Sequence, residues 1–487
     1  MAGIGFALRK LYEQETLSSV VKASGHAAVI AAGPWLFTIF SLIAITAASE
    51  SLAGHQTLAT FRAVIIYAFA TSLVLAAPVT IVATRLVADD LWRRKTDRMR
   101  SLMVAAFLFA IGAVALGVAA LAVRLAIPAK LALALFATTA VVAMIWVALA
   151  FCGAVKDYAG ITRSFVAGLV IATSLATAAA LTGLGAPGMV WGFATGLTAT
   201  LFGLILRILA TFPGAPLGAH DSLLGQCRPL LRGFSTYSYL ALGALFGTAG
   251  VWIDKWVFWS SVEGQTVEGG LIHAPLYDSA MFIASLVIIP ALAQFVVKLE
   301  TDFFDRYQNY YGTIQDHGTI DQIQTARLRL QHLSLDSLAL ITAAQLAIAA
   351  VLVLIAPAIV ESLNLQFRQI AILRYGALGS VFQFIFIAAT SMIVFFDRRK
   401  IYCALQALFL VLNLALSMLT VAWGEDYYGV GYFAAALVSS AVALVIAERT
   451  FARLNYLTFI GNNPSVTAAR RPFWTRVRAL LKRAEAA

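Results

Sequence analysis

Residues 102–123 read LMVAAFLFAIGAVALGVAALAV, an apolar run without a single charged side chain. An α-helix needs about 20 such residues to cross the hydrocarbon core of a bilayer, because each residue advances the helix by only about 1.5 Å. The run is also bounded as a membrane helix should be, since Arg124 follows it directly. This stretch therefore predicts a transmembrane helix.

The composition extends this prediction to the whole chain. Hydrophobic residues make up 61% of the 487 positions and charged residues 12%, and the mean hydropathy is +0.85. A soluble domain balances the two kinds far more evenly, and the strands of a membrane barrel would alternate instead of forming solid blocks. We expect an all-α membrane protein with about twelve transmembrane helices, at 26–49, 61–84, 102–123, 131–151, 164–182, 188–210, 233–259, 275–297, 335–356, 371–396, 401–423 and 428–447.

Lysine and arginine residues are concentrated on alternate connections between these runs. Cytoplasmic connections are the ones that carry such an excess. With the N-terminus in the cytoplasm, the outer side keeps only Arg62, Arg124, Lys130, Lys255, Arg368 and Arg374 of the 35 basic residues. The pattern predicts a multi-pass protein of the bacterial inner membrane with both termini in the cytoplasm. It also explains the net charge of +11 without a nucleic-acid partner.

The twelve runs divide into two sets of six. A connector at 211–232 is rich in proline and glycine and too polar to span. Pro78 and Pro290 occupy similar places in the second helix of each set, which favours a parallel repeat, although proline is common in membrane helices anyway. The expected organisation is an N-terminal interfacial segment (1–25), two six-helix bundles around a central cavity (26–210 and 233–447), the cytoplasmic linker (211–232) and a basic cytoplasmic tail (448–487).

Three segments have an amphipathic pattern. Apolar residues recur at helical spacing at Ile4, Leu8 and Leu11, from Phe303 to Tyr311, and from Phe473 to Leu481. Aromatic and basic helices of this kind lie at the headgroup level. We expect all three on the inner membrane surface in contact with lipids, and docking of a protein partner is the alternative for the tail.

The clearest candidate site is Trp252-Ile253-Asp254-Lys255-Trp256, in or near the outer end of the seventh run. Charged residues inside the hydrocarbon region are costly and normally face a cavity or a partner. Neighbouring side chains diverge by about 100° on a helix, so Asp254 and Lys255 need not bond each other. They could both border a translocation pathway, or they could form a neutralised pair within an interfacial aromatic belt.

Further polar residues in or next to the runs are weaker candidates for the pathway, since each is more commonly an anchor or a bridge between helices. These are Asp278, Lys156, Asp157, Arg207, Arg374, Gln294 and Gln383. The charged group after the eighth run is a candidate cytoplasmic interface and otherwise a solvated surface. It comprises Glu300, Asp302, Asp305 and Arg306.

Signals of catalysis or of a bound cofactor do not stand out. Cys152, Cys227 and Cys403 lack metal or redox spacing, and His26 and His273 are isolated from one another. A membrane glycosyltransferase would need a sizeable acidic outer loop, whereas the first outer connection is short. We therefore expect no enzyme activity, no metal and no cofactor.

Several short motifs occur in order along nearly the whole chain. They are Met1-Ala2-Gly3-Ile4-Gly5-Phe6, Gly33-Pro34-Trp35, Lys156-Asp157-Tyr158, Trp252-Ile253-Asp254-Lys255, Leu299-Glu300-Thr301-Asp302-Phe303-Phe304 and Tyr427-Tyr428-Gly429-Val430-Gly431-Tyr432. In these motifs the chain resembles the PelG family, inner-membrane proteins of bacterial Pel exopolysaccharide systems within the flippase superfamily of multidrug and oligosaccharide-lipid transporters.

The resemblance implies a function that the composition does not. A member of this family would move nascent Pel polysaccharide, an amino-sugar-rich polymer, across the inner membrane. Its expected partners are that polymer, a PelF-like cytoplasmic glycosyltransferase, and PelD-like and PelE-like membrane proteins. Two alternatives remain: a scaffold that anchors the synthase without transporting, and a small-molecule exporter of the same superfamily.

Overall fold

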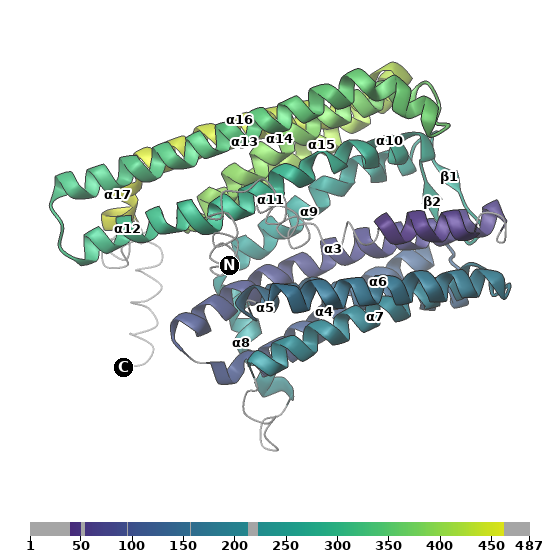
Figure 1. The fold of residues 1–487 in the computed structure, drawn as a ribbon, viewed down its shortest axis with the longest axis horizontal. Coiled ribbons are helices and arrows are strands. Elements are labelled where there is room, and N and C mark those ends of the chain that lie inside the picture. The colour runs from purple at the N-terminus through teal and green to yellow at the C-terminus, as the bar shows by residue number, and fades with distance from the viewer. Residues whose placement is uncertain (1–38, 50–53, 95, 156, 213–222, 462–487) are drawn as a thin grey trace, which may run out of the picture.

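The computed structural model describes residues 39–49, 54–94, 96–155, 157–212 and 223–461. The expected interfacial segment at 1–25, the amphipathic part of the tail and the candidate Lys156 lie outside these ranges. Figure 1 shows two groups of long helices, which we call the first half (39–212) and the second half (223–461).

The regular elements among the described residues of the first half are all helices. It contains a helix over Ile39–Ser49 and then α3 (His55–Trp92), the short 3₁₀ helix η1 (Thr96–Arg98), α4 (Met99–Arg124), α5 (Ala129–Val155), α6 (Tyr158–Leu181) and α7 (Gly185–Thr211).

The second half adds a small antiparallel hairpin to its helices. It contains α8 (Leu223–Thr236), α9 (Ser238–Trp259), β1 (Gln265–Thr266), β2 (Ile272–His273), α10 (Pro275–Leu286), α11 (Ile288–Lys298), the π-helical turn η2 (Leu299–Phe303), α12 (Phe304–Gln315), α13 (Ile320–Ser362), α14 (Gln369–Phe395), α15 (Arg399–Trp423), η3 (Glu425–Tyr427), α16 (Val430–Ala452), α17 (Leu454–Tyr456) and η4 (Leu457–Gly461).

The fold class predicted from the sequence is confirmed. Ten helices of the described residues are long and apolar enough to cross a membrane. The other two expected spans correspond to the helix Ile39–Ser49 and to α9, which is 22 residues long. The linker is more structured than predicted, because α8 occupies its second part and α9 begins only at Ser238.

Close helix packing occurs at the same place in each half. A Cβ on Gly192 of α7 would lie 2.7 Å from the carbonyl oxygen of Leu175 in α6, and one on Gly431 of α16 would lie 2.7 Å from that of Leu416 in α15. Glycine lets membrane helices approach until their backbones touch. Both pairs are the last two helices of their half, as a repeat predicts.

The aromatic segment after the eighth span is the one clear departure from the sequence prediction. Its helix does not leave the bundle for the membrane surface, because α10, α11, η2 and α12 follow one another without a loop. Phe303 stacks edge-on against Phe395, and the buried Tyr310 donates a hydrogen bond to Asn455 Oδ1 at 2.9 Å. These rings pack against the protein itself, so the predicted interfacial position is wrong.

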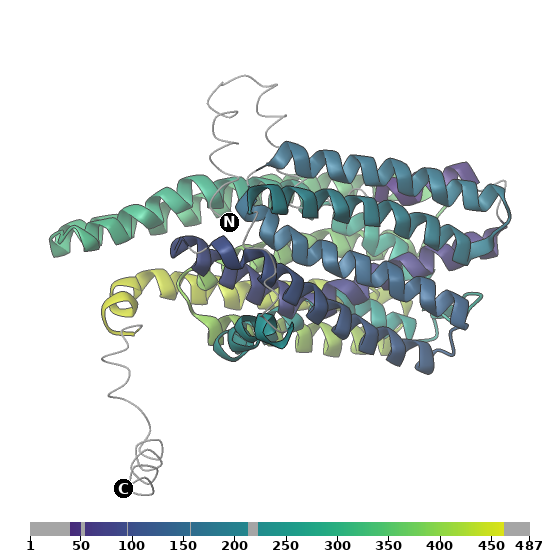
Figure 2. The same ribbon diagram turned by 90° about the horizontal axis from the view of Figure 1, so that it is seen from below.

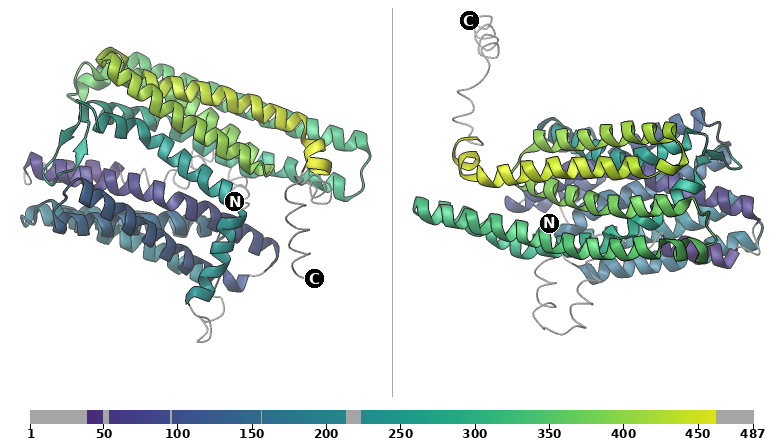
Figure 3. Two further views of the ribbon diagram at one scale, coloured as in Figure 1. Left: turned by 180° about the vertical axis from the view of Figure 1, so that it is seen from behind. Right: turned by 90° about the horizontal axis from the view of Figure 1, so that it is seen from above.

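The same segment forms an arm that projects beyond the other helices. The arm comprises α12, a turn and the first part of α13, and it extends past the first half in Figures 2 and 3. A capping box starts α13, since Thr319 and Gln322 each bond the other's backbone N–H. Arg327 fixes the arm to the end of α16 by donating to the carbonyl oxygens of Phe451 and Ala452, both at 3.1 Å.

Candidate functional site

The strongest charged pair of the sequence lies in the interior of the second half. Asp254 on α9 is completely buried, and its Oδ2 lies 3.0 Å from the Nζ of Lys255, whose side chain is 16% exposed. Lys255 also donates to the carbonyl oxygen of Val251 at 3.2 Å. The two side chains therefore bond each other although they are sequence neighbours, because the lysine is long enough to fold back along the helix.

Aromatic side chains surround this pair. Tyr277 of α10 is buried and donates to Asp254 Oδ2 at 2.9 Å, and its ring stacks on Phe258 with 3.7 Å between ring centres. The Nζ of Lys255 lies 5.8 Å from the Trp252 ring centre and 5.9 Å from that of Tyr432 on α16. Residues from three helices thus surround one ion pair. They give the carboxylate a hydrogen bond and the ammonium group two aromatic rings.

Asp278 lies one residue beyond Tyr277 and belongs to the same polar region. Its Oδ2 accepts hydrogen bonds from the indole Nε1 of Trp259 at 2.8 Å and from the backbone N–H of Ala274 at 3.0 Å. Its Oδ1 is buried and has no hydrogen-bond partner among the described residues, and the same holds for the indole Nε1 of Trp252. One hydrogen-bond acceptor, of Asp278, and one donor, of Trp252, thus have no partner near the ion pair among the described residues.

Other polar side chains in this half connect helices. The hydroxyl of Tyr432 donates to the amide oxygen of Gln383 on α14. Asn413 on α15 donates to the carbonyl oxygen of Gly250 on α9 at 2.8 Å. Of these residues the sequence singled out only Gln383, since an isolated tyrosine or asparagine in an apolar run carries no spacing signal.

The remaining candidates lie apart from this region. Asp157 and Arg207 form a partly exposed pair, with 3.1 Å between Oδ2 and Nη1, at one end of α6 and α7. Arg374 is exposed and donates to the carbonyl oxygen of Val353 at 3.1 Å, and Gln294 on α11 is exposed. Among the charges of the cytoplasmic candidate group, Asp302 pairs with Lys298 at 2.8 Å.

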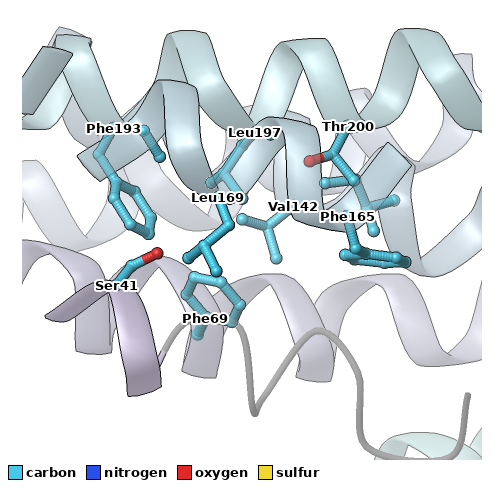
Figure 4. A pocket seen from close by; sticks show the side chains of 11 residues that line it. Ser41, Phe69, Val142, Phe165, Leu169, Phe193, Leu197 and Thr200 are labelled. Carbon is cyan, nitrogen blue, oxygen red and sulfur yellow. The ribbon is translucent and has the colours of Figure 1, made fainter. Parts of the chain in front are cut away.

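The interior of the first half is different. It holds a cavity with about 20 Å³ of space for water, which is room for about one molecule. Its lining is apolar apart from the hydroxyls of Ser41 and Thr200, as Figure 4 shows. No ionisable side chain lines it, so the charged interior is confined to the second half within the described part of the chain.

The two halves meet along a seam between α3 and α9. At the predicted cytoplasmic end, which we call the inner end, the hydroxyl of Tyr237 donates to Asp89 Oδ2 at 2.6 Å, and Arg85 donates to the carbonyl oxygen of Val394 at 3.3 Å. Burial and the bond to Asp89 raise the pKa of Tyr237, which keeps this phenol protonated as a donor. At the opposite, outer end the hairpin of β1 and β2 reaches the first half.

The fold, two bundles of membrane helices that meet along one seam, is similar to that of solved transporters of the MOP superfamily. An outward-facing multidrug resistance transporter of the MATE family is 17% identical, with a TM-score of 0.60, and the match covers 89% of this chain and 96% of that one. An inward-facing multidrug resistance transporter of the MATE family is 14% identical with a TM-score of 0.54, covering 88% and 99% of the two chains. A superfamily transporter from Pyrococcus furiosus, whose binding pocket has reverse polarity, is 15% identical with a TM-score of 0.55, covering 89% and 96%.

The particular family follows from the sequence. Residues 1–459 match the family described as "PelG: Putative exopolysaccharide Exporter (EPS-E)". The chain therefore belongs to the PelG family, as its motifs predicted. No curated protein matches it.

Proposed function

We propose that this chain moves nascent Pel-type exopolysaccharide across the bacterial inner membrane, along the seam between its two halves. The match to an exopolysaccharide-exporter family over residues 1–459 carries the proposal. The transporter fold agrees with it, since such folds work by moving one bundle against the other around a central pathway.

The open polar atoms of the second half support a polymer as the cargo. Both atoms are buried, and when the second half opens the indole N–H of Trp252 can donate to a sugar hydroxyl and Oδ1 of Asp278 can accept from a hydroxyl or an amino sugar. Lys255 keeps part of its side chain exposed beside them. A few weak contacts suit a chain that must slide, because a tight site would stop conduction.

The arm is the proposed docking site for the PelF-like glycosyltransferase. It projects beyond the helices at the predicted cytoplasmic end (Figure 2) and is held rigidly at its base by Arg327 and Tyr310. The base of the arm, which we define as η2 and the first turn of α12, carries the predicted interface residues Glu300, Asp302, Asp305 and Arg306. A rigid polar projection next to the seam would place polymer synthesis at the entrance of the pathway, beside the PelD-like and PelE-like membrane partners.

Reversing the charge at the base of the arm tests this docking. Asp302→Lys with Asp305→Lys should lower the amount of glycosyltransferase that co-purifies with the chain by about tenfold, since like charges across an interface repel. Glu425→Lys, at the opposite end of the molecule, is the control and should leave co-purification unchanged. Equal recovery of the enzyme with both variants would exclude the arm as the docking site.

Transport itself is tested in inverted membrane vesicles that contain the chain and its partners, supplied with the glycosyltransferase and its sugar nucleotide. Polymer should accumulate inside the vesicles, protected from an added glycoside hydrolase, and vesicles without the chain should show none. The arm equally suits the second candidate function, a scaffold that only anchors the synthase. For a scaffold the polymer would be made at the same rate but would stay open to the hydrolase.

A further inference from the structure

The hairpin between α9 and α10 joins the two halves at the outer end of the seam. Gln265 pairs with His273 and Thr266 with Ile272 in an antiparallel register. Figures 1 and 3 show β1 and β2 crossing from the second group of helices to the first. We call residues 264–274 the strap.

The strap is inserted into the first half. Leu271 is completely buried and Val267 is 8% exposed, and both belong to one hydrophobic core with Phe61 and Leu131 of the first half. A Cβ on Gly270 would lie only 2.4 Å from the carbonyl oxygen of Leu125. The backbone of the strap thus lies directly on the first half, where only glycine fits.

Tyr67 of α3 fastens the strap. Its hydroxyl donates to the carbonyl oxygen of Ile272 at 2.8 Å and accepts from the N–H of the same residue at 3.3 Å. Its ring stacks on Trp259 at the end of α9, with 4.6 Å between ring centres. About two turns of α3 away, Thr60 donates to the carbonyl oxygen of Glu268 at 3.0 Å.

The strap is also tied to the charged interior of the second half. Asp278 Oδ2 accepts from both Trp259 and Ala274, the residues at which the hairpin segment leaves α9 and reaches α10. Tyr277, the residue before Asp278, bonds Asp254. A rearrangement around Asp254 and Asp278 would therefore move both ends of the strap.

The two ends of the seam are held in different ways. Both ends have buried apolar contacts, such as those of Leu230 at the inner end. They differ in their polar contacts: at the outer end main-chain groups of the strap are bonded by Tyr67 and Thr60, whereas at the inner end the contacts of Asp89 and Arg85 are made by side chains that are only partly buried. Polar side-chain contacts near water are exchanged for water at little cost. We propose that the strap is a latch: it keeps the outer end of the seam closed and must withdraw from the first half before the polymer leaves.

This proposal rests on the proposed transport function, so its first test avoids transport. In a background with the native cysteines replaced, Ala274→Cys places a thiol at a completely buried position of the strap. Tyr67→Phe removes both hydrogen bonds to Ile272 and keeps the ring. It should raise the rate of thiol labelling at residue 274 in the purified protein by about tenfold, because two hydrogen bonds no longer oppose release.

The control is Tyr427→Phe, at the same end of the molecule, where the ring packs on Trp423 outside the strap. It should leave the labelling rate unchanged. An equal rate in the Tyr67→Phe variant and the parent protein would overturn the latch, whatever the cargo.

The second test tethers the strap in the vesicle assay. Thr60→Cys and Glu268→Cys, joined by a short cross-linker that carries two thiol-reactive thiosulfonate groups and forms reducible disulfides with loss of sulfinate, should lower the protected polymer by about tenfold, with recovery after reduction. Undiminished export through the tethered protein would overturn the proposal. If the untethered parent protein exports nothing, the transport function fails instead, and the labelling result still decides whether the strap opens.

Discussion

In the first half, the buried polar side chains of the described residues are serine and threonine hydroxyls, and in the second half they include Asp254, Gln345, Gln383 and Asn413. Most of these hydroxyls bond a carbonyl oxygen of their own helix, as Thr138 does to Ala134 at 2.8 Å, and Thr60 bonds the strap. The larger polar groups of the second half mostly bond other helices. The two halves thus have similar helix packing but interiors of different chemistry. Similar packing does not require that both halves carry the buried charged site.

The largest expected loss of stability follows from removing one charge of the buried ion pair in the second half. Asp254→Ala leaves Lys255 largely buried without its counter-charge and should lower the free energy of unfolding by about 3–5 kcal/mol. Replacing both, with Asp254→Leu and Lys255→Met, should recover most of that loss. Denaturant titration of the purified protein in detergent measures both changes.

Lys298→Ala serves as the comparison for that experiment. It breaks the exposed pair with Asp302 and should cost less than about 1 kcal/mol. If Asp254→Ala cost no more than Lys298→Ala, the pair would be solvated and not part of a protein interior.

The next largest effect concerns the close helix packing at glycine, which occurs in both halves. Gly192→Ala and Gly431→Ala each drive a Cβ against a carbonyl oxygen of the neighbouring helix. Backbone atoms cannot give way easily, so we expect a loss of about 1–3 kcal/mol in each case. Gly112→Ala meets nothing within 4 Å and should be neutral or stabilising. The same denaturant titration measures these changes. A loss of stability in only one of the two glycine variants would contradict equivalent packing in the two halves.

The smallest effect concerns single hydrogen bonds. Asn413→Ala removes the bond between α15 and α9 and should cost about 1 kcal/mol. Thr138→Val removes only a bond within one helix and should change the free energy of unfolding by less than about 0.5 kcal/mol. Equal losses would mean that polar groups do not hold the second half together more than the first.

The sequence predicted the membrane helices well, because length and hydropathy alone decide whether a segment can span. It also identified Asp254 as a costly charge inside an apolar run. It did not predict how that charge is satisfied, since Tyr277 and Tyr432 come from distant helices and a lone tyrosine has no periodic signal.

Two other features needed the structure. The aromatic face of Phe303 and Tyr310 has the same helical period whether it faces lipid or protein, so the pattern could not distinguish an interfacial helix from the base of the arm. The sequence pattern indicates only that the strap is an outer connection between two membrane helices. Gly269 and Gly270 are a turn signal, but the first-half residues that share a hydrophobic core with Leu271, such as Phe61 and Leu131, are far away in the sequence.

The most direct test of the account compares protected with total polymer in the inverted vesicles for the parent protein and for Asp254→Ala with Lys255→Ala. The account predicts that the variant assembles with its partners and supports synthesis, while the protected fraction falls to the level of vesicles that lack the chain. An unchanged protected fraction would contradict it, because polymer would then cross the membrane without the charged interior of the second half.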